Sequence, residues 1–105
     1  MRKIETQMCQ AIQSNKNWKS GNTEVVTNET TSNVYLHGNL IATVTDTDMT
    51  IFDGGWQSNT TKSRLNALID RFCNAVADGV FRKDYCWFIR DNNVTREWEQ
   101  GYIFS

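Results

Sequence analysis

The chain has 105 residues, the length of one domain, and 39% of them are hydrophobic, which is enough for one modest core. Its 11 Lys and Arg against 12 Asp and Glu give a formal net charge of -1. This charge argues against a protein that binds nucleic acid by bulk charge and against one that mimics DNA by an overall negative charge. No secretory signal and no apolar run of roughly 20 residues is visible, so we expect a cytoplasmic protein without a membrane segment.

An amphipathic helix is predicted at the start of the chain, over residues 3–14. The apolar residues of this stretch have the i, i+4, i+7, i+8 spacing of one helix face: Ile4, Met8, Ala11 and Ile12. The polar residues between them, Glu5 included, are expected to face water. A turn at residues 20–22 separates this helix from the first predicted strand.

Short strands are predicted next, from β-branched or alternating stretches separated by turn residues: 23–27, 33–37, 40–45 and 48–52. Gly38 and Asn39 stand between the second and the third of them, the arrangement of a two-residue hairpin turn. Gly54 and Gly55 stop the last strand, because glycine adopts backbone conformations closed to other residues. Strands joined by such tight turns predict an antiparallel β-meander.

The strongest local pattern is a second helix that starts near residues 58–61 and ends at Gly79. Its apolar residues recur at helical spacing: Leu65, Leu68, Ile69, Phe72 and Val76. Ser, Asn and Thr at 58–61 are N-cap residues, and Gly79 stands where a helix-terminating glycine belongs. Two strands come after it, over 81–90 and 94–98. The predicted order is α-β-β-β-β-α-β-β, an α+β fold in a single domain (residues 1–105) with both helices packed on one face of the sheet.

The start of the second helix carries positive charge where helices usually carry Asp or Glu. Lys62 and Arg64 come directly after Thr60 and Thr61. Two cations, two hydroxyls and free N–H groups at one helix end would bind a phosphate or a carboxylate, so these four residues are a candidate site for an anion or a partner. The alternative is that both cations are solvated and that a Thr serves only as the cap. The stretch is no Walker loop, because its glycine spacing differs.

Aromatic and basic residues form a second candidate surface for a partner: Trp56, Trp87, Trp98, Arg90 and Arg96. Residues 81–90, read as one strand, have apolar side chains on both faces. Either this strand is covered on both sides, or one face meets another chain. That chain would be a partner protein or, in a homodimer, a second copy.

No constellation of residues indicates catalysis, a metal or a cofactor. His37 is the only histidine, and a hydrogen-bonding role near the hairpin turn is the better interpretation. Asp46, Asp48 and Asp53 depart from the EF-hand pattern and are expected to be turn carboxylates. The 3 cysteines are far apart, which favours reduced thiols over a disulfide framework or a zinc site.

Three sequence blocks resemble those of a family of small, mostly uncharacterised proteins of tailed bacteriophages. The blocks are the Tyr-Leu-His-Gly-Asn-Leu-Ile-Ala run at 35–42, Gly55-Trp56, and the Thr-Thr-Lys-Ser-Arg-Leu-Asn-Ala-Leu run at 60–68. The Trp-Lys-Ser-Gly-Asn-Thr run at 18–23 also matches, so that the resemblance covers about half of the chain. It implies a phage source and expression inside an infected bacterium. Small phage proteins of this kind are commonly accessory factors that bind host or defence machinery.

The leading hypothesis is therefore a non-enzymatic phage accessory protein in the host cytoplasm. It would bind, and inhibit, a host or defence macromolecule such as a CRISPR nucleoprotein complex. The alternative is a nucleic-acid-binding domain, because a helix, a meander and a helix with a basic start resemble in outline the double-stranded-RNA-binding arrangement. A small enzyme is the third hypothesis.

Overall fold

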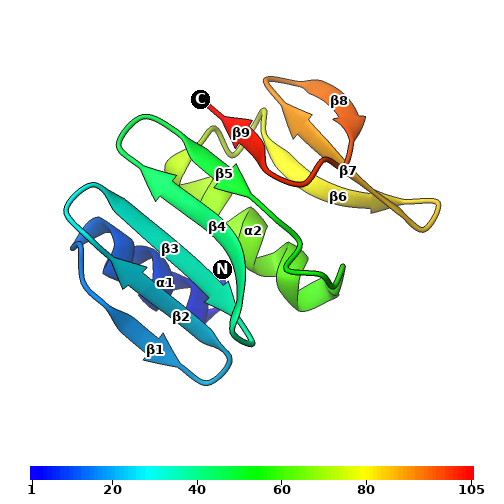
Figure 1. Cartoon of the computed structure of the whole chain (residues 1–105). Coiled ribbons are helices and arrows are strands. Elements are labelled where there is room, and N and C mark those ends of the chain that lie inside the picture. Colours follow the sequence, from blue (N-terminus) through cyan, green and yellow to red (C-terminus); the bar gives the residue numbers. More distant parts are fainter.

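A six-stranded antiparallel sheet is covered on one face by two helices and a small second sheet (Figure 1). The computed structural model describes all 105 residues. The helices are α1 (Lys3–Gln13) and α2 (Asn59–Phe72). The large sheet contains, in spatial order, β1 (Trp18–Ser20), β2 (Thr23–Thr27), β3 (Thr31–Leu36), β4 (Asn39–Thr45), β5 (Met49–Ile51) and β9 (Tyr102–Phe104). The small sheet contains β6 (Gly79–Lys83), β7 (Cys86–Asp91) and β8 (Val94–Glu97). The predicted α+β class and antiparallel meander are confirmed.

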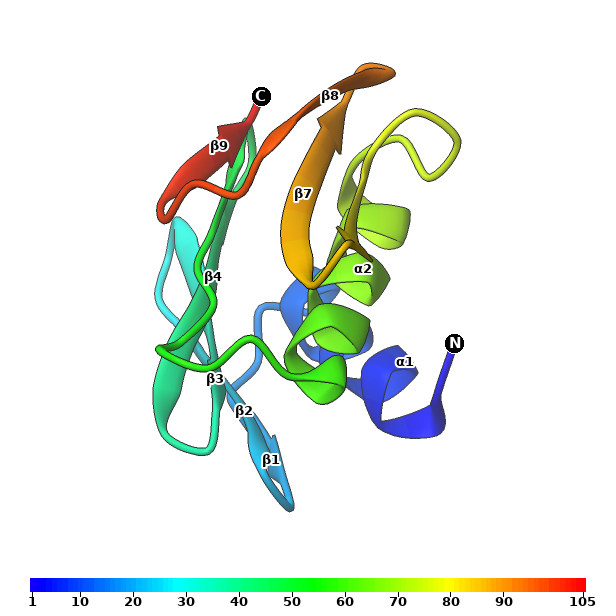
Figure 2. The ribbon, with the colours of Figure 1, turned by 90° about the vertical axis from the view of Figure 1, so that its right-hand side faces the viewer.

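The core lies between the large sheet and the elements that cover it (Figure 2). Alternate residues of each strand point inward, so that Val25 of β2 is opposite Val34 of β3 and both are fully buried. The fully buried residues of the covering layer include Met8, Leu65, Leu68 and Ile89. The apolar stripes predicted for the helices therefore meet one face of the meander.

The β3–β4 hairpin turn is displaced by one residue from its predicted position. His37 and Gly38, with φ of 51° and 78°, form the turn, and Asn39 is already the first residue of β4. The pairing of β3 with β4 shifts register between Val34 and Tyr35, which indicates a bulge in the middle of the hairpin. An inserted residue of this kind moves the turn along the chain.

The helix α2 ends at Phe72, so its predicted extension to Gly79 is wrong. Val76 is 83% exposed, and Gly79 is the first residue of β6. The helix ends because the backbone of the next residue, Cys73, is extended, with φ of -122° and ψ of -155°. A separate tight turn follows, in which the carbonyl of Asn74 accepts the N–H groups of Ala77 and Asp78. The side chain of Asp78 in turn accepts the N–H of Asn74 at 2.9 Å.

The stretch 81–90 is a hairpin and not one strand. Asp84 and Tyr85 form its turn, and Lys83 of β6 is opposite Cys86 of β7. Two further strands were not predicted, β1 and β9, and β9 pairs with β5 at the edge of the large sheet. Both are only 3 residues long, too short for an alternation pattern to appear in the sequence.

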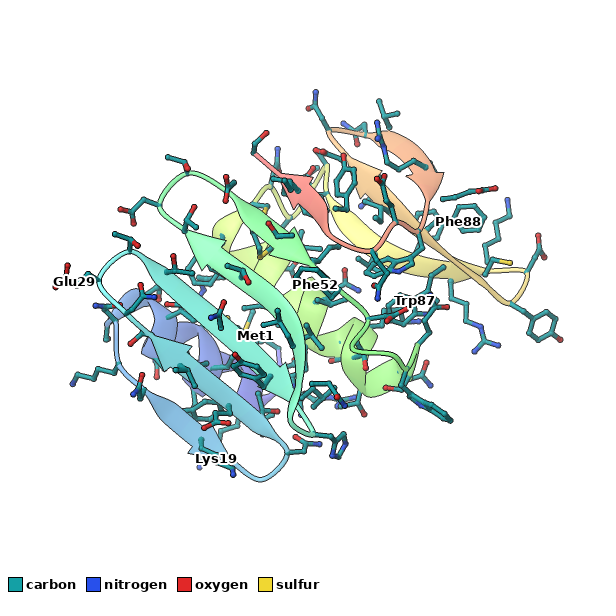
Figure 3. The ribbon with its side chains drawn as sticks, in the orientation of Figure 1. Met1, Lys19, Glu29, Phe52, Trp87 and Phe88 are labelled. Atoms are coloured by element: carbon teal, nitrogen blue, oxygen red, sulfur yellow. The ribbon has the colours of Figure 1, made fainter.

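The small sheet is attached to α2 through one amide side chain. Asn66 accepts the N–H of Val80 and donates to its carbonyl, both at 2.8 Å, as a neighbouring strand would. Val80, Trp87 and Ile89 then complete the core on the inner side of this sheet. Figure 3 shows Trp87 and its neighbour Phe88 on opposite sides of β7.

Candidate functional site

The first turn of α2 is capped from within the chain. Ser58 is the N-cap, and its Oγ accepts the N–H of Thr61 at 3.1 Å. Thr61 is buried, and its hydroxyl donates to the carbonyl of Trp56 at 3.1 Å. Since Ser58 also accepts the N–H of Lys62 through its carbonyl, only the first two N–H groups of the helix are left without a protein partner. Thr61, predicted to face a ligand, is a structural residue of this turn.

Arg64 points into the protein, so the prediction that it binds an external anion is wrong. Only 4% of it is exposed, and its Nη1 lies 2.8 Å from Oε2 of Glu5, in the one ion pair of the structure. Its Nε donates to Oγ1 of Thr23 at 3.0 Å. The cation therefore joins α2 to α1 and to β2.

Glu5 completes this interior cluster, although it was expected to face water. Its Oε2 also accepts a hydrogen bond from the hydroxyl of Ser63 at 2.5 Å, and its Oε1 accepts the N–H of Arg2 at 3.2 Å. Burial by itself raises the pKa of Glu5, but these hydrogen bonds and the charge of Arg64 outweigh burial and hold the pKa below its ordinary value. Glu5 is thus an ionised, fully partnered carboxylate inside the fold.

The outer side of the same helix start is free. Lys62 makes no ion pair, and Trp56, on the loop before α2, is 74% exposed. A pocket of about 410 Å³ lies beside this loop and is lined by Trp56, Thr60, His37 and Asn39, among others. Two segments that carried the family resemblance, the β3–β4 turn and the start of α2, therefore meet at one pocket. We call this region the Trp56 pocket.

The predicted aromatic and basic surface is not one surface. Trp87 is 5% exposed and belongs to the core, where it packs edge-on against Trp98 with ring centroids 5.1 Å apart. Arg96 is exposed and lies over the ring of Tyr102 at 5.1 Å. Arg90 is half-buried on the small sheet, and its Nε has no hydrogen-bond partner. Because Trp87 is part of the core, the five residues do not form one exposed surface.

The inner face of β7 is covered by the core, whereas its outer face is only partly covered within the chain. Trp87 and Ile89 face the core, while Phe88 stacks on Phe81 of β6 with centroids 5.6 Å apart. A second chain on the outer face of this strand stays a prediction.

An acidic groove lies at the other end of the molecule from the Trp56 pocket, and sequence reasoning missed it. The groove has a volume of about 920 Å³ and lies among the β2–β3 turn, the β4–β5 turn and the C-terminal ends of both helices. Its lining contains acidic residues and no Lys, Arg or His: Glu29, Asp46, Asp48, Asp78 and Asp91. The acids come from segments far apart in the sequence, so no local motif signals the groove. No group of three or more of its side chains could hold a metal ion.

Two weak acids beside the groove, Cys73 and Tyr102, have raised pKa values. Burial raises the pKa of the Cys73 thiol to about 11, and the charges of Asp78 and Asp91 add to this effect. Burial and a hydrogen bond to Asp91 likewise raise the pKa of Tyr102, whose hydroxyl donates to Oδ2 of Asp91 at 2.5 Å.

Comparison with known proteins decides the origin of the chain. A family model described as Kyanoviridae Gp96 protein matches residues 1–105. The chain belongs to the Kyanoviridae Gp96 family. It is therefore a small phage protein, as the sequence resemblance implied, and the match includes the half of the chain that the resemblance left uncovered. No curated protein and no solved structure matches this Gp96 protein. None of its helices has the length and apolar character needed to cross a membrane.

Proposed function

We propose that this Gp96 protein is an accessory protein that binds, and inhibits, a protein of the infected bacterium through the Trp56 pocket. The exposure of Trp56 beside a pocket carries the proposal, because a solvated Trp next to a concave surface is the typical anchor of a protein interface. Burying this exposed ring against a partner would remove apolar surface from water and so favour binding.

The loop that bears Trp56 is held in place before any partner arrives. The carboxylate of Asp53 accepts the N–H of Gly55 at 2.7 Å and the side-chain N–H of Gln100 at 2.9 Å. Gly54, with φ of 70°, lies so close to β4 that a Cβ would approach Cγ2 of Ile41 to 3.2 Å. A preformed loop loses little conformational entropy on binding, so that more of the contact energy becomes affinity.

The polar groups around the pocket indicate which partner surface fits. Lys62 is unpaired, Thr60 is half-buried, and the N–H groups of Asn59 and Thr60 are free at a helix N-terminus. The lining also contains the carboxylate of Asp53, which already accepts N–H groups of Gly55 and Gln100, while Lys62 lies outside the lining. The groups left free are N–H donors, with one cation nearby on the same helix, so they suit a carboxylate beside an apolar side chain of the partner. The partner is inhibited if this contact covers its active site or a binding site that it needs.

A pull-down from the lysate of a susceptible host tests the proposal, with wild type, Trp56→Ala and Val76→Ala as baits. Val76 is the matched control, because it is an exposed apolar residue remote from the pocket. We expect one host protein to be retained by wild type and Val76→Ala and lost with Trp56→Ala. With that protein purified, Trp56→Ala should weaken the Kd by about 30-fold, the effect of an interface anchor worth roughly 2 kcal/mol. Inhibition is then measured as loss of the partner's own activity on addition of wild type.

Equal retention by wild type and Trp56→Ala would refute the role of the pocket. The nucleic-acid alternative stays a prediction, and no contact in the structure adds to it, since Arg64 is taken up inside the fold. Its signature would be binding to duplex RNA that weakens steeply with salt and is lost in Lys62→Glu.

A further inference from the structure

The β6–β7 turn holds an aromatic side chain in water at a cost in backbone strain. Asp84 and Tyr85 have φ of 51° and 67°, the left-handed region in which Asn-Gly is favoured for a two-residue turn. For a residue as bulky as Tyr this conformation costs roughly 1–2 kcal/mol. The ring of Tyr85 is nevertheless 89% exposed. The Tyr85 ring is not part of the core cluster.

Positive charge surrounds this ring. The guanidinium of Arg82 lies 5.3 Å from the centroid of the Tyr85 ring, and Lys83 is the next residue of β6. Both are exposed and unpaired, and they outnumber the single carboxylate of Asp84. Figure 1 shows the turn projecting beyond the rest of the small sheet. We call residues 82–86 the β6–β7 tip.

The acidic groove has the complementary properties. Five acidic side chains and no cation line it, and the half-buried Phe72 contributes apolar surface to the same lining, with the buried Phe104 and Val44 beneath. The volume of about 920 Å³ accepts the end of a hairpin and an aromatic ring. The tip and the groove lie at opposite ends of β7, since Cys86 begins the strand at the tip and Asp91 ends it at the groove.

We propose that the β6–β7 tip of one copy docks in the acidic groove of a second copy. The Tyr85 ring packs on the apolar part of the groove, and Arg82 and Lys83 meet its carboxylates. The tip and the groove lie at opposite ends of the molecule, so the contact is head-to-tail. Each added copy therefore leaves one tip and one groove free. The protein therefore associates into open chains. The contact uses no residue of the Trp56 pocket, so it stands or falls independently of the proposed function.

Sedimentation velocity of the purified protein over a wide range of concentration, at low and at high salt, tests this inference. An interface of one tip and one groove is small, so we expect association in the micromolar range or weaker, with no discrete largest species. High salt should weaken it, because charged groups at the rim of the contact are screened.

Two variants separate the two surfaces. Tyr85→Gly removes the ring and relieves the turn, so its fold should be at least as stable as wild type. Glu29→Lys/Asp46→Lys reverses two exposed carboxylates of the groove. Each variant alone should stay monomeric. Mixed together they should form a 1:1 complex that grows no further, because the intact tip of one then meets the intact groove of the other.

The charge-matched control is Glu97→Lys/Glu99→Lys, which alters two exposed acids outside the groove and should associate as wild type does. A wild-type protein that stays monomeric at every concentration would overturn the proposal. So would a closed dimer that both variants retain, or a mixture of the two variants that remains monomeric.

Discussion

Lys62 and Arg64, two residues apart at the start of α2, have opposite roles. Arg64 points inward and pairs with Glu5, whereas Lys62 is only half-buried and makes no ion pair. Residues two positions apart on a helix lie on nearly opposite faces, so one short cationic run cannot form a single site. Arg64 therefore maintains the fold, and of the two cations only Lys62 is available to a partner.

Removing the inner cation should have the largest effect. Arg64→Ala leaves the carboxylate of Glu5 buried without its partner, and the expected loss of unfolding free energy is roughly 3–5 kcal/mol. Urea unfolding followed by tryptophan fluorescence measures it. Lys62→Ala is the matched control and should change stability by no more than about 0.5 kcal/mol. If both substitutions cost the same, the contrast between the inner and the outer cation is wrong.

Acid should remove the contribution of the inner cluster. The pKa of Glu5 is lower in the folded chain than in the unfolded one, so its ionised form stabilises the fold at neutral pH. That stability is fully present above the unfolded pKa and is lost as the pH falls through the folded pKa. Glu5→Gln should therefore cost roughly 1–3 kcal/mol at neutral pH and progressively less in acid. Unfolding curves of both proteins across this range test the sign, and a gap that does not change with pH would contradict it.

The sequence contained a signal for the inward direction of Arg64 that attention to charge alone overlooked. Thr61, Arg64, Leu65 and Leu68 have the i, i+3, i+4, i+7 spacing, so Arg64 lies within the apolar face of the helix. Periodicity of this kind predicted both helices, although it placed the end of the second one too late. What it could not supply was the buried acid, because Glu5 is 59 residues away in the chain from Arg64.

The acidic groove and the β6–β7 tip could not be predicted from the sequence, for a different reason. The acids of the groove come from segments that only the folded chain brings together, from Glu29 to Asp91. The tip was hidden because only Asp84-Tyr85 separates the two strands, and this pair is not a typical turn sequence. Tyr85 was consequently assigned to a strand. Tyr85 is not a usual residue of a two-residue hairpin turn, which is why the sequence did not indicate one.

The smallest expected effect is the difference in stability between a variant of the N-cap of α2, Ser58, and a variant of its neighbour Thr60. Ser58→Ala removes the side-chain acceptor of the Thr61 N–H and should cost about 1 kcal/mol. Thr60→Ala, on the side of the Trp56 pocket, should cost no more than about 0.5 kcal/mol, because its side chain makes no hydrogen bond within the chain. Urea unfolding of the two variants gives this difference, and Kd values for the partner should reverse the order. A Thr60→Ala variant that unfolds as easily as Ser58→Ala would mean that the outer side of this helix start is also built for stability.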